Sequence, residues 1–518
     1  MRVTLLSINC NDRHYSLGTF TLAATARRHL PDVEVRVVNH SVLKTNRHIL
    51  FDLLSPPSDV YGLSVHHGHG PKVLELLRDL RRLQPHATVL LGGIDAIAQD
   101  PRALERLVDY CVVGEGEWAF VHVLKALSSG GKPGPFEGLY SPADLARADG
   151  MKLVQHGELD DVPSPYLDGV FDSYDEYPTV YVETYRGCVW DCSFCYEGRG
   201  RRRTGGYSMA RVHEELRYLL ETRKVPQIEF YDTIFNVSPE RTRSLLEFLV
   251  RHNHGTTFIG EFMLEWLDEE LIDLLGKAGF AMMEVGLQSV NEETLRKSGR
   301  KVDLARFRRN AEAVLDRTNV NLCIDAMYGL ENDAFEDFRA TVDYIGTLSG
   351  KNGRRPTPIL FVTSVHPGTR LYAGGADGLA LAGEHGGTVL ASPSLTLDDT
   401  KRFYELFYGY LFLRGTFPGT MNDLTGALLR HSGLGLSSLY EALARFLGEF
   451  PEGRMILEQT EWTDFRASPL LRFFLSTIDR GYLMEVARRI GVDSPEALAE
   501  IGGLIARETG DASADPSA

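Results

Sequence analysis

Cysteine is scarce in this sequence, and long apolar runs are missing from it. The chain holds 6 cysteines among 518 residues, too few for the dense disulfide framework of a small secreted domain. No apolar run reaches the roughly 18 residues of a membrane-spanning helix, and the start lacks the long apolar core of a signal peptide. We therefore expect a cytoplasmic protein without a membrane partner, whose thiols stay reduced.

A basic excess is missing as well. The sequence has 55 Lys and Arg against 71 Asp and Glu, a formal net charge of −16. A surface that coats nucleic acid has the opposite balance, so we expect no nucleic-acid partner. With 43% hydrophobic and 24% charged residues, the composition is that of a globular protein. Its length predicts roughly two to four domains.

The first part of the chain alternates short apolar runs with amphipathic segments. VTLLSI (3–8) and ATVLL (87–91) are typical of buried strands, and PKVLELLRDLRRL (71–83) is typical of an amphipathic helix. This alternation predicts parallel strands joined by helical crossovers, so we expect residues 1–130 to form a doubly wound, Rossmann-like α/β domain. Glycine-rich polar segments follow the predicted strands, at the edge where such sheets bind ligands.

The rest of the chain divides into four segments. Residues 131–176 have weak periodicity and several Gly and Pro, which is typical of a connector. A second strand–helix series over 177–373 predicts a partial (β/α)6 barrel, with functional groups at the C-terminal ends of its strands. Residues 374–507 are expected to form a helical C-terminal domain in which Thr396 is an N-cap. Residues 508–518 are expected to be a disordered tail.

Three of the cysteines stand together in GCVWDCSFCYEG (187–198), at Cys188, Cys192 and Cys195. A reducing compartment argues against a disulfide. A structural zinc site needs four ligands, usually in two pairs, and the remaining cysteines and histidines form no second CxxC or HxxxH. Three thiolates on one loop suit three irons of a [4Fe–4S] cluster and leave the fourth iron open. Zinc and incidental cysteines remain alternatives at this point.

The same segment resembles the signature of the radical S-adenosylmethionine (SAM) superfamily. That signature is CxxxCxxC with an aromatic residue, here Phe194, before the last cysteine. In the superfamily the open iron binds SAM, and an electron from the reduced cluster usually cleaves SAM to a 5′-deoxyadenosyl radical. The resemblance implies a [4Fe–4S] cluster on Cys188, Cys192 and Cys195, and an external electron donor of the flavodoxin or ferredoxin type.

Further segments resemble strand motifs of this superfamily that lie near SAM. Besides Phe194, the SAM contacts that the resemblance implies are Asp232 in IEFYDTIF, Glu284 and Gln288 in EVGLQS, and Gly329 and Leu330 in AMYGLEND. Ordinary polar capping of strand ends is the alternative for the three polar residues of this set.

A Rossmann-like domain directly before such a barrel resembles the cobalamin-binding branch of the superfamily. LSVHHGHG, VLLGGIDA and CVVGEGE stand where that branch has the loops of its third, fourth and fifth strands. The resemblance implies cobalamin contacts at Asn11, Ser64, His66, His67, Gly92, Gly93, Gly114, Glu115, Gly116 and Glu117. Glycine lets the main chain lie against the corrin and its nucleotide tail. A degenerate nucleotide-binding fold without a ligand is the alternative.

The histidines of this domain raise the question of a cobalt ligand. The DxHxxG motif, by which some cobalamin enzymes supply a histidine to cobalt, is missing. His66, His67 and His69 are therefore candidates for cobalt ligation, for corrin contact or for a structural role. We expect that none of them coordinates cobalt.

Together these features imply a cobalamin-dependent radical SAM enzyme that acts on a small molecule. The segment TVLASPSLTLDDTKRFYELFYGYLF (388–412) is similar to a helical extension found in one branch of these proteins. An inert C–H carbon has no lone pair to attack SAM, so hydrogen abstraction must precede methylation, and cobalamin can carry the methyl group. We expect methylation of an unactivated carbon. The alternatives are oxidation, cyclisation or ring rearrangement without net methylation and, more remotely, a non-catalytic cobalamin- or SAM-binding protein.

Overall fold

The chain divides into two compact units. In the computed structural model, the described residues are 1–509 except 12, 67, 97–98, 146–156, 172–176, 198–203, 374–377, 383–386, 418 and 450–481. The first unit comprises residues 1–261, 365–376 and 383–387, and the second comprises residues 262–364, 377–382 and 388–518. Within the described part of the chain, no helix is both long enough and apolar enough to cross a membrane.

The N-terminal part of the first unit is built on a six-stranded sheet of order β2-β1-β3-β4-β5-β6. Its parallel strands are β1 (Arg2–Asn9), β2 (Glu34–Ser41), β3 (Val60–Ser64), β4 (Thr88–Gly92) and β5 (Tyr110–Val112). All of β1 except its first residue is buried, as expected for a strand that helices cover on both faces.

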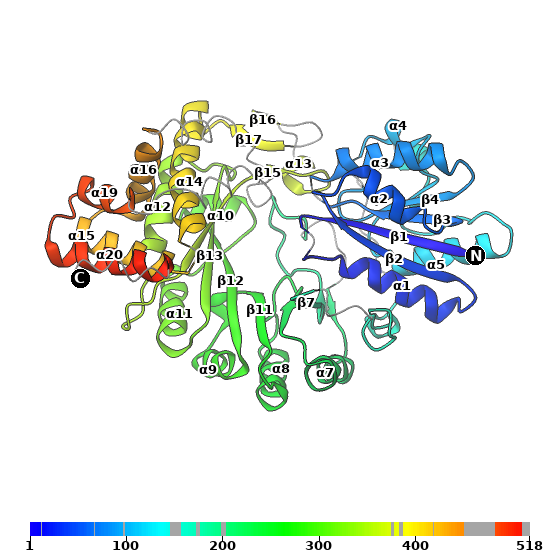
Figure 1. The fold of residues 1–518 in the computed structure, drawn as a ribbon, viewed down its shortest axis with the longest axis horizontal. Coiled ribbons are helices and arrows are strands. Elements are labelled where there is room, and N and C mark those ends of the chain that lie inside the picture. The colour runs from blue at the N-terminus through cyan, green and yellow to red at the C-terminus, as the bar shows by residue number, and fades with distance from the viewer. Residues whose placement is uncertain are drawn as a thin grey trace. The chain divides into compact units, whose positions relative to one another are not determined.

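Helices lie on both faces of this sheet (Figure 1). α1 (Leu17–His29) and α5 (Glu117–Ser128) share one apolar core with the sheet, in which Ala23 and Phe120 pack with Val3. α2 (Asn46–Leu53), α3 (Gly70–Leu83) and the short α4 (Pro101–Leu104) share the other core, which contains Leu76 and Leu91. The predicted doubly wound domain is therefore confirmed.

A second series of strands and helices begins after the connector. The first unit contains β7 (Val180–Val182), β10 (Gln227–Phe230) and all but the last residue of β11 (Thr257–Phe262), in the order β11-β10-β7. The second unit contains β12 (Phe280–Gln288), β13 (Asn321–Tyr328) and β14 (Thr357–Val362), in the order β14-β13-β12. The pairs within each set are parallel, which confirms the predicted strand–helix series.

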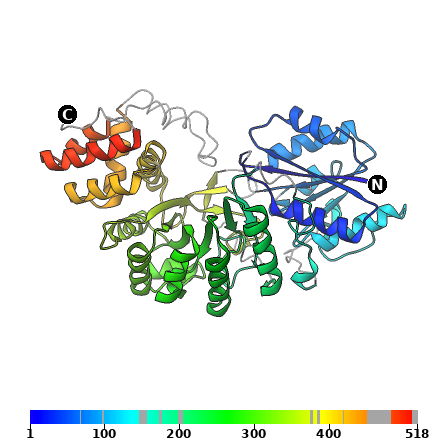
Figure 2. The same ribbon diagram turned by 60° about the horizontal axis from the view of Figure 1, so that its bottom comes forward.

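Helices follow the strands of this series and are coloured from teal through green in Figure 2. They are α7 (Met209–Arg217), α8 (Pro239–His252), α9 (Glu269–Ala278), α10 (Glu292–Lys297), α11 (Leu304–Arg317) and α12 (Phe335–Thr347). Side-chain caps fix their starts: Asp268 accepts from the main-chain N–H of Leu271 at 2.8 Å, and Asp303 accepts from that of Arg306 at 3.0 Å.

Helices dominate the C-terminal part of the second unit. They are α14 (Leu397–Thr416), α15 (Met421–Ser432), α16 (Leu436–Leu447), α19 (Tyr482–Arg489) and α20 (Pro495–Thr509). Thr396 is the N-cap of α14 as predicted, because its Oγ1 accepts from the N–H of Asp399 at 3.1 Å. α14 and α16 approach closely at Gly409, where an added Cβ would lie 1.8 Å from the carbonyl oxygen of Tyr440. The predicted tail falls mostly outside the described residues.

Small β elements within residues 131–176 and shortly after residue 373 were not predicted. β6 (Leu139–Tyr140) lies within the expected connector and adds an antiparallel strand to β5. β16 (Ala380–Ala382) pairs antiparallel with β17 (Gly387–Ala391) where the sequence indicates only a boundary. The remaining short elements are α6 (Pro142–Leu145), β8 (Tyr185–Arg186), β9 (Gly205–Gly206), β15 (Ser364–Val365) and α13 (Arg370–Ala373).

Candidate functional site

The three clustered cysteines lie on one loop of the first unit, residues 187–197, which we call the cysteine loop. It leaves β8 directly after β7, so it occupies the predicted position behind the first strand of the second series. Cys192 is buried, Cys188 and Cys195 are partly exposed, and none of the three forms a disulfide. Phe194 is partly exposed on the same loop.

The thiol of Cys195 is protonated at neutral pH when no metal is bound. Burial, with a contribution from the thiols of Cys192 and Cys188, raises the pKa of Cys195 to about 12. The main-chain N–H of Glu197 lies 3.4 Å from Cys195 Sγ and donates to it. A thiol with so high a pKa ionises at neutral pH only when a bound metal displaces its proton.

Among the described residues, no three His, Cys, Asp or Glu side chains converge on a single metal ion. A zinc ion needs its sulfur ligands at about 2.3 Å, whereas an iron–sulfur cluster distributes its thiolates over several irons.

Asp232 holds the base of the cysteine loop. Its Oδ1 accepts from the main-chain N–H groups of Thr184 at 2.6 Å and Tyr185 at 3.0 Å, and its Oδ2 accepts from Thr184 Oγ1 at 2.5 Å. The residue is 1% exposed, and burial raises its pKa to about 7. Both carboxylate oxygens therefore cap donors at the strand end, which is the alternative to SAM contact that the sequence analysis names. Direct contact of Asp232 with SAM stays a prediction.

The predicted cobalamin contacts converge on one cavity of about 440 Å³ at the C-terminal edge of the N-terminal sheet. Of the predicted residues, it is lined by Ser64, His66, Gly92, Gly93, Gly114, Glu115, Gly116 and Glu117. Asn11 is not among the described lining residues, and its Oδ1 accepts from the main-chain N–H of Arg13 at 2.8 Å. His67 lies outside the described residues. The volume falls within the range of about 300–1,000 Å³ typical of cofactor pockets.

The glycines of this cavity are required by the backbone. Gly93 has φ 94°, and an added Cβ would lie 2.5 Å from the carbonyl oxygen of Val65. Gly114 also has φ 94°, a conformation that residues with a side chain rarely adopt. The loops after β4 and β5 therefore present bare main chain to the cavity, which fits a large planar ligand.

The histidines at this edge have different environments. Burial, with a contribution from His69, lowers the pKa of His66 to about 4, so its imidazole is neutral at pH 7. His69 Nδ1 lies 2.9 Å from the carbonyl oxygen of Ile8. Because a carbonyl only accepts, this nitrogen carries the proton and is committed to the main chain.

A second cavity of about 550 Å³ adjoins the first within the same unit. The two share His66, Ile94, Arg186 and Tyr196 among their lining residues, and the second is also lined by Cys10, His14 and Tyr231. Tyr196 follows Cys195 directly in the chain. One side of this cavity is therefore the cysteine loop, and another is the edge of the N-terminal sheet.

Sequence reasoning missed a buried ion network beside these cavities. The Arg186 guanidinium donates to Glu183 Oε2 at 2.6 Å and to Glu117 Oε1 at 2.8 Å, and it lies 3.6 Å from Glu115 Oε1. Arg186 is 9% exposed, and its Nη2 also lies 3.2 Å from the hydroxyl of Tyr207. The sequence contains no signal for this network, because Glu117 precedes Arg186 by 69 residues.

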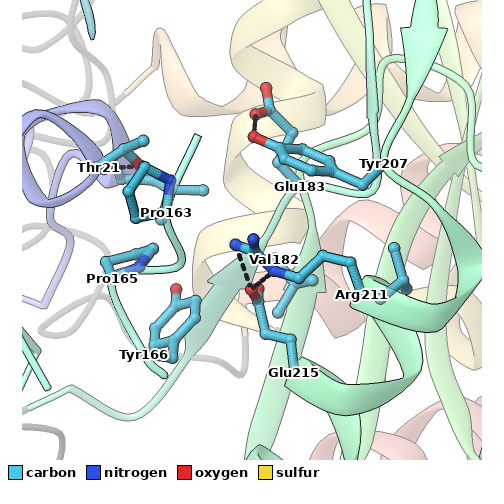
Figure 3. A pocket seen from close by; sticks show the side chains of 11 residues that line it. Thr21, Pro163, Pro165, Tyr166, Val182, Glu183, Tyr207, Arg211 and Glu215 are labelled. Atoms are coloured by element: carbon cyan, nitrogen blue, oxygen red, sulfur yellow. Dashed lines mark hydrogen bonds and ion pairs between the residues drawn. The ribbon is translucent and has the colours of Figure 1, made fainter. Parts of the chain in front are cut away.

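A smaller pocket lies on the other side of Tyr207 and Glu183 (Figure 3). Its volume of about 20 Å³ is that of roughly one water molecule. Arg211 contacts Glu215 there at 3.4 Å, and burial nevertheless raises the pKa of Glu215. The pocket is too small for a cofactor.

The remaining predicted SAM contacts lie in the second unit. Gln288 ends β12 with φ 70°, is 8% exposed, and its Oε1 has no hydrogen-bond partner among the described residues. Glu284 pairs in register with Cys323 of β13. Gly329 follows β13 with φ 84°, and Leu330 is 1% exposed. A buried, unpaired amide oxygen at a strained strand end is typical of a ligand site.

Comparisons with known proteins agree with this geometry. The radical SAM superfamily matches residues 182–345, and the B12 binding domain matches residues 3–124. Among curated relatives, the hopanoid C-3 methylase of Methylococcus capsulatus is 26% identical over 46% of this chain and 46% of its own length. The chain spans about half the length of the first curated relatives it matches.

Solved structures share the fold. The cobalamin-dependent SAM radical enzyme OxsB, with aqua-cobalamin and SAM bound, aligns with a TM-score of 0.66 and 15% identity over 98% of this chain and 83% of its own. The radical SAM methyltransferase TsrM from Kitasatospora setae, with cobalamin and a [4Fe–4S] cluster bound, aligns with a TM-score of 0.56 and 20% identity over 74% of this chain and 80% of its own.

Proposed function

We propose that this chain, which joins a B12-binding domain to a radical SAM domain, is a cobalamin-dependent radical SAM enzyme that methylates an unactivated carbon of a small molecule. The observation that carries the proposal is that the cysteine loop and the glycine-lined cavity lie in one compact unit and share Tyr196 and Arg186 at their junction. Cofactors that act on one substrate must be held close together, because reacting atoms approach to about 3–3.5 Å.

The residues divide into a cluster set, a cobalamin set and a SAM set. Cys188, Cys192 and Cys195 would hold a [4Fe–4S] cluster, and the cavity of about 440 Å³ would hold cobalamin. When bound, the reduced cluster supplies the electron that cleaves SAM, and cobalamin supplies the methyl group. His66 lines the proposed cobalamin cavity, and His69 lines the adjoining cavity. Neither histidine coordinates cobalt.

The SAM set stays as predicted: Phe194, Asp232, Glu284, Gln288, Gly329 and Leu330. Support for Gln288 comes from its unpaired buried oxygen and its positive φ. Support for Gly329 comes from its φ of 84°, a conformation that residues with a side chain rarely adopt. Asp232 acts through the cysteine loop, whose base it fixes at Thr184 and Tyr185.

We place the substrate in the cavity of about 550 Å³ next to Tyr196. The lining there includes His14 and Tyr231, which offer hydrogen bonds that orient a small molecule. The neutral imidazole of His66 accepts or donates a hydrogen bond without adding charge.

The setting of the protein completes the proposal. We propose that a flavodoxin- or ferredoxin-type donor reduces the cluster and that the protein works in the cytoplasm, where its thiols stay reduced. We propose domain boundaries at residues 1–130 for cobalamin binding, 131–176 for the connector, 177–373 for the radical SAM barrel, 374–507 for the helical domain and 508–518 for the tail.

Anaerobic turnover with methyl-deuterated SAM tests the proposed reaction. The reduced, cluster- and cobalamin-loaded protein is incubated with small molecules that co-purify with it, and the products are analysed by mass spectrometry. We expect deuterated methyl in the product, with equal amounts of S-adenosylhomocysteine and 5′-deoxyadenosine. Substrate turnover without label in the product would refute methylation and leave an oxidation or rearrangement.

A further inference from the structure

The cysteine loop is tied to the N-terminal domain at both of its ends. Before the first cysteine, Arg186 donates to Glu117 Oε1 at 2.8 Å, and Glu117 is the first residue of α5. After the last cysteine, the hydroxyl of Tyr196 donates to Asp95 Oδ1 at 2.9 Å. Asp95 lies in the loop after β4, and Glu117 stands where the loop after β5 meets α5.

The tie at Arg186 is buried and specific. Arg186 is 9% exposed and Glu117 is 6% exposed, so each charge depends on the other for compensation. Glu183 holds the Arg186 Nε at 2.6 Å, which aims the rest of the guanidinium at the N-terminal domain. Arg186 stands two residues before Cys188, so it fixes the point at which the cysteine loop begins.

The tie at Tyr196 is also enclosed. Asp95 is 6% exposed, and its main-chain N–H donates to the carbonyl of Val65 at 3.2 Å, which fixes the loop after β4. The ring of Tyr196 packs against His366 with 4.2 Å between ring centroids. Tyr196 directly follows Cys195, so it fixes the point at which the cysteine loop ends.

The loops that hold these two ties also form the proposed cobalamin site. Gly92 and Gly93 precede Asp95, and Glu115 and Glu117 flank the last glycine of their loop. Of these five residues, all but Asp95 are among the described lining residues of the cavity of about 440 Å³. Arg186 and Tyr196 line the same cavity. A ligand that orders these loops therefore orders both ends of the cysteine loop.

We propose that Arg186 and Tyr196 are positioning residues that couple the two cofactor sites, so that cobalamin binding and cluster binding strengthen each other. The inference rests on the proposed function, because it takes cobalamin and the cluster as the two ligands. Coupling between two binding sites is reciprocal: if the cluster raises the affinity for cobalamin by some factor, cobalamin raises the affinity for the cluster by the same factor.

The test measures cobalamin affinity with and without the cluster. The full chain is kept anaerobic, and the Kd for hydroxocobalamin is measured by equilibrium dialysis on protein with a reconstituted cluster and on protein stripped of iron. We expect the cluster to tighten binding roughly 5- to 150-fold, the usual range of coupling between sites. Equal Kd values in the two forms would overturn the proposal.

Two variants assign the coupling to the ties. Tyr196→Phe removes only the hydroxyl that reaches Asp95, and Arg186→Gln removes the charge that reaches Glu117. We expect each to bring the ratio of the two Kd values toward one. Arg81→Gln is the matched control, because its ion pair with Asp109 at 2.8 Å lies before β5 and neither residue is among the described lining residues of the two cavities. Its ratio should equal that of the wild type.

A second readout keeps the proposal decidable if Arg186→Gln fails to fold. Release of iron to a chelator is followed with and without hydroxocobalamin, and we expect cobalamin to slow release in the wild type but not in Tyr196→Phe. A Tyr196→Phe variant that keeps the full effect of the wild type in both readouts contradicts the assignment. A chain that binds neither hydroxocobalamin nor a cluster contradicts the proposed function instead, whereas independent binding of both contradicts only the coupling.

Discussion

Asp232 accepts three hydrogen bonds from two consecutive residues, Thr184 and Tyr185, at 2.5 to 3.0 Å. These residues precede the cysteine loop, so one carboxylate at the end of β10 sets the direction in which that loop leaves β8. All three donors would lose their acceptor if the carboxylate were removed.

The first prediction concerns Asp232→Ala. Without the carboxylate, the main-chain N–H groups of Thr184 and Tyr185 lose the acceptor that they have at 2.6 and 3.0 Å, and each unsatisfied buried group costs about 1–3 kcal/mol. We expect a lower Tm and a reduced iron content after anaerobic reconstitution. Gln227→Glu is a poor control, because Gln227 belongs to β10, which pairs with β7. The control is therefore Asp398→Asn, at an exposed residue of α14. It should retain the wild-type iron content.

The second prediction concerns the three cysteines. Replacing Cys188, Cys192 and Cys195 together by Ala should abolish iron and sulfide binding, because these thiolates are the proposed ligands of the cluster. Iron and sulfide assays after reconstitution measure the effect. Cys323→Ala is the matched control, since Cys323 is a buried thiol on β13 in the second unit. Full cluster occupancy in the triple variant would show that the ligands lie elsewhere.

These two sites show how far the sequence alone leads. The cysteine spacing and the glycine loops are local patterns, so both were visible in the sequence, as were the apolar runs of β1 and β13. The use of Asp232 was not, because the donors Thr184 and Tyr185 lie 48 and 47 residues earlier in the chain. A pattern of neighbouring residues does not specify which polar groups meet across strands.

The unpredicted β elements have a related cause. β6 contains only Leu139 and Tyr140 and stands among Gly and Pro, so it has no period of its own. It forms because the edge of β5 offers unpaired main-chain groups. The N-cap at Thr396, by contrast, was predictable because the Thr–x–x–Asp pattern is satisfied within four consecutive residues.

The third prediction concerns the axial ligand of cobalt. The DxHxxG motif is missing from the sequence, so we expect neither His66 nor His69 to coordinate cobalt. EPR spectra of the cob(II)alamin-bound protein are compared between ¹⁴N-histidine and ¹⁵N-histidine samples. Identical spectra are expected. A change in superhyperfine splitting on labelling would identify a histidine ligand.

The fourth prediction concerns pH and Asp333. The residue is fully buried, its Oδ2 has no hydrogen-bond partner among the described residues, and burial with the nearby Asp337 raises its pKa to about 8. An ordinary Asp has a pKa near 3.9 in an unfolded chain, so the folded protein holds a proton that the unfolded protein releases. Stability should therefore fall as the pH rises from about 4 to about 8 and then level off.

Asp333→Asn removes this dependence. We expect its Tm to match that of the wild type near pH 4 and to exceed it increasingly up to about pH 8, where the difference in unfolding free energy is on the order of a few kcal/mol. Asp398→Asn, at an exposed residue of the same unit, is the control. Its Tm should depend on pH as the Tm of the wild type does. Parallel Tm profiles for Asp333→Asn and the wild type would contradict the prediction.

The fifth prediction concerns Gly409 in α14. Because an added Cβ would meet the main chain of Tyr440 at 1.8 Å, Gly409→Ala must separate α14 from α16, and overpacking of this kind costs about 1–3 kcal/mol. Gly503→Ala in α20 is the matched control, since nothing lies within 4 Å of its added Cβ and helix propensity gains up to about 1 kcal/mol. Gly409→Ala should lower the Tm, and Gly503→Ala should raise it. An increase in both variants would contradict close packing of α14 against α16.

The long sequence separation of the two ties has a consequence for biosynthesis. Asp95 precedes Tyr196 by 101 residues, and Glu117 precedes Arg186 by 69. Ribosomes deliver the N-terminal domain first, and domains fold as units while the chain is still growing. The parallel strands β1 to β5 and their helices are complete by Ser128, so the cysteines emerge opposite a surface that is already folded. Mutations that delay folding of that surface should therefore leave the nascent thiols open to oxidation, even when they lie far from the cysteines.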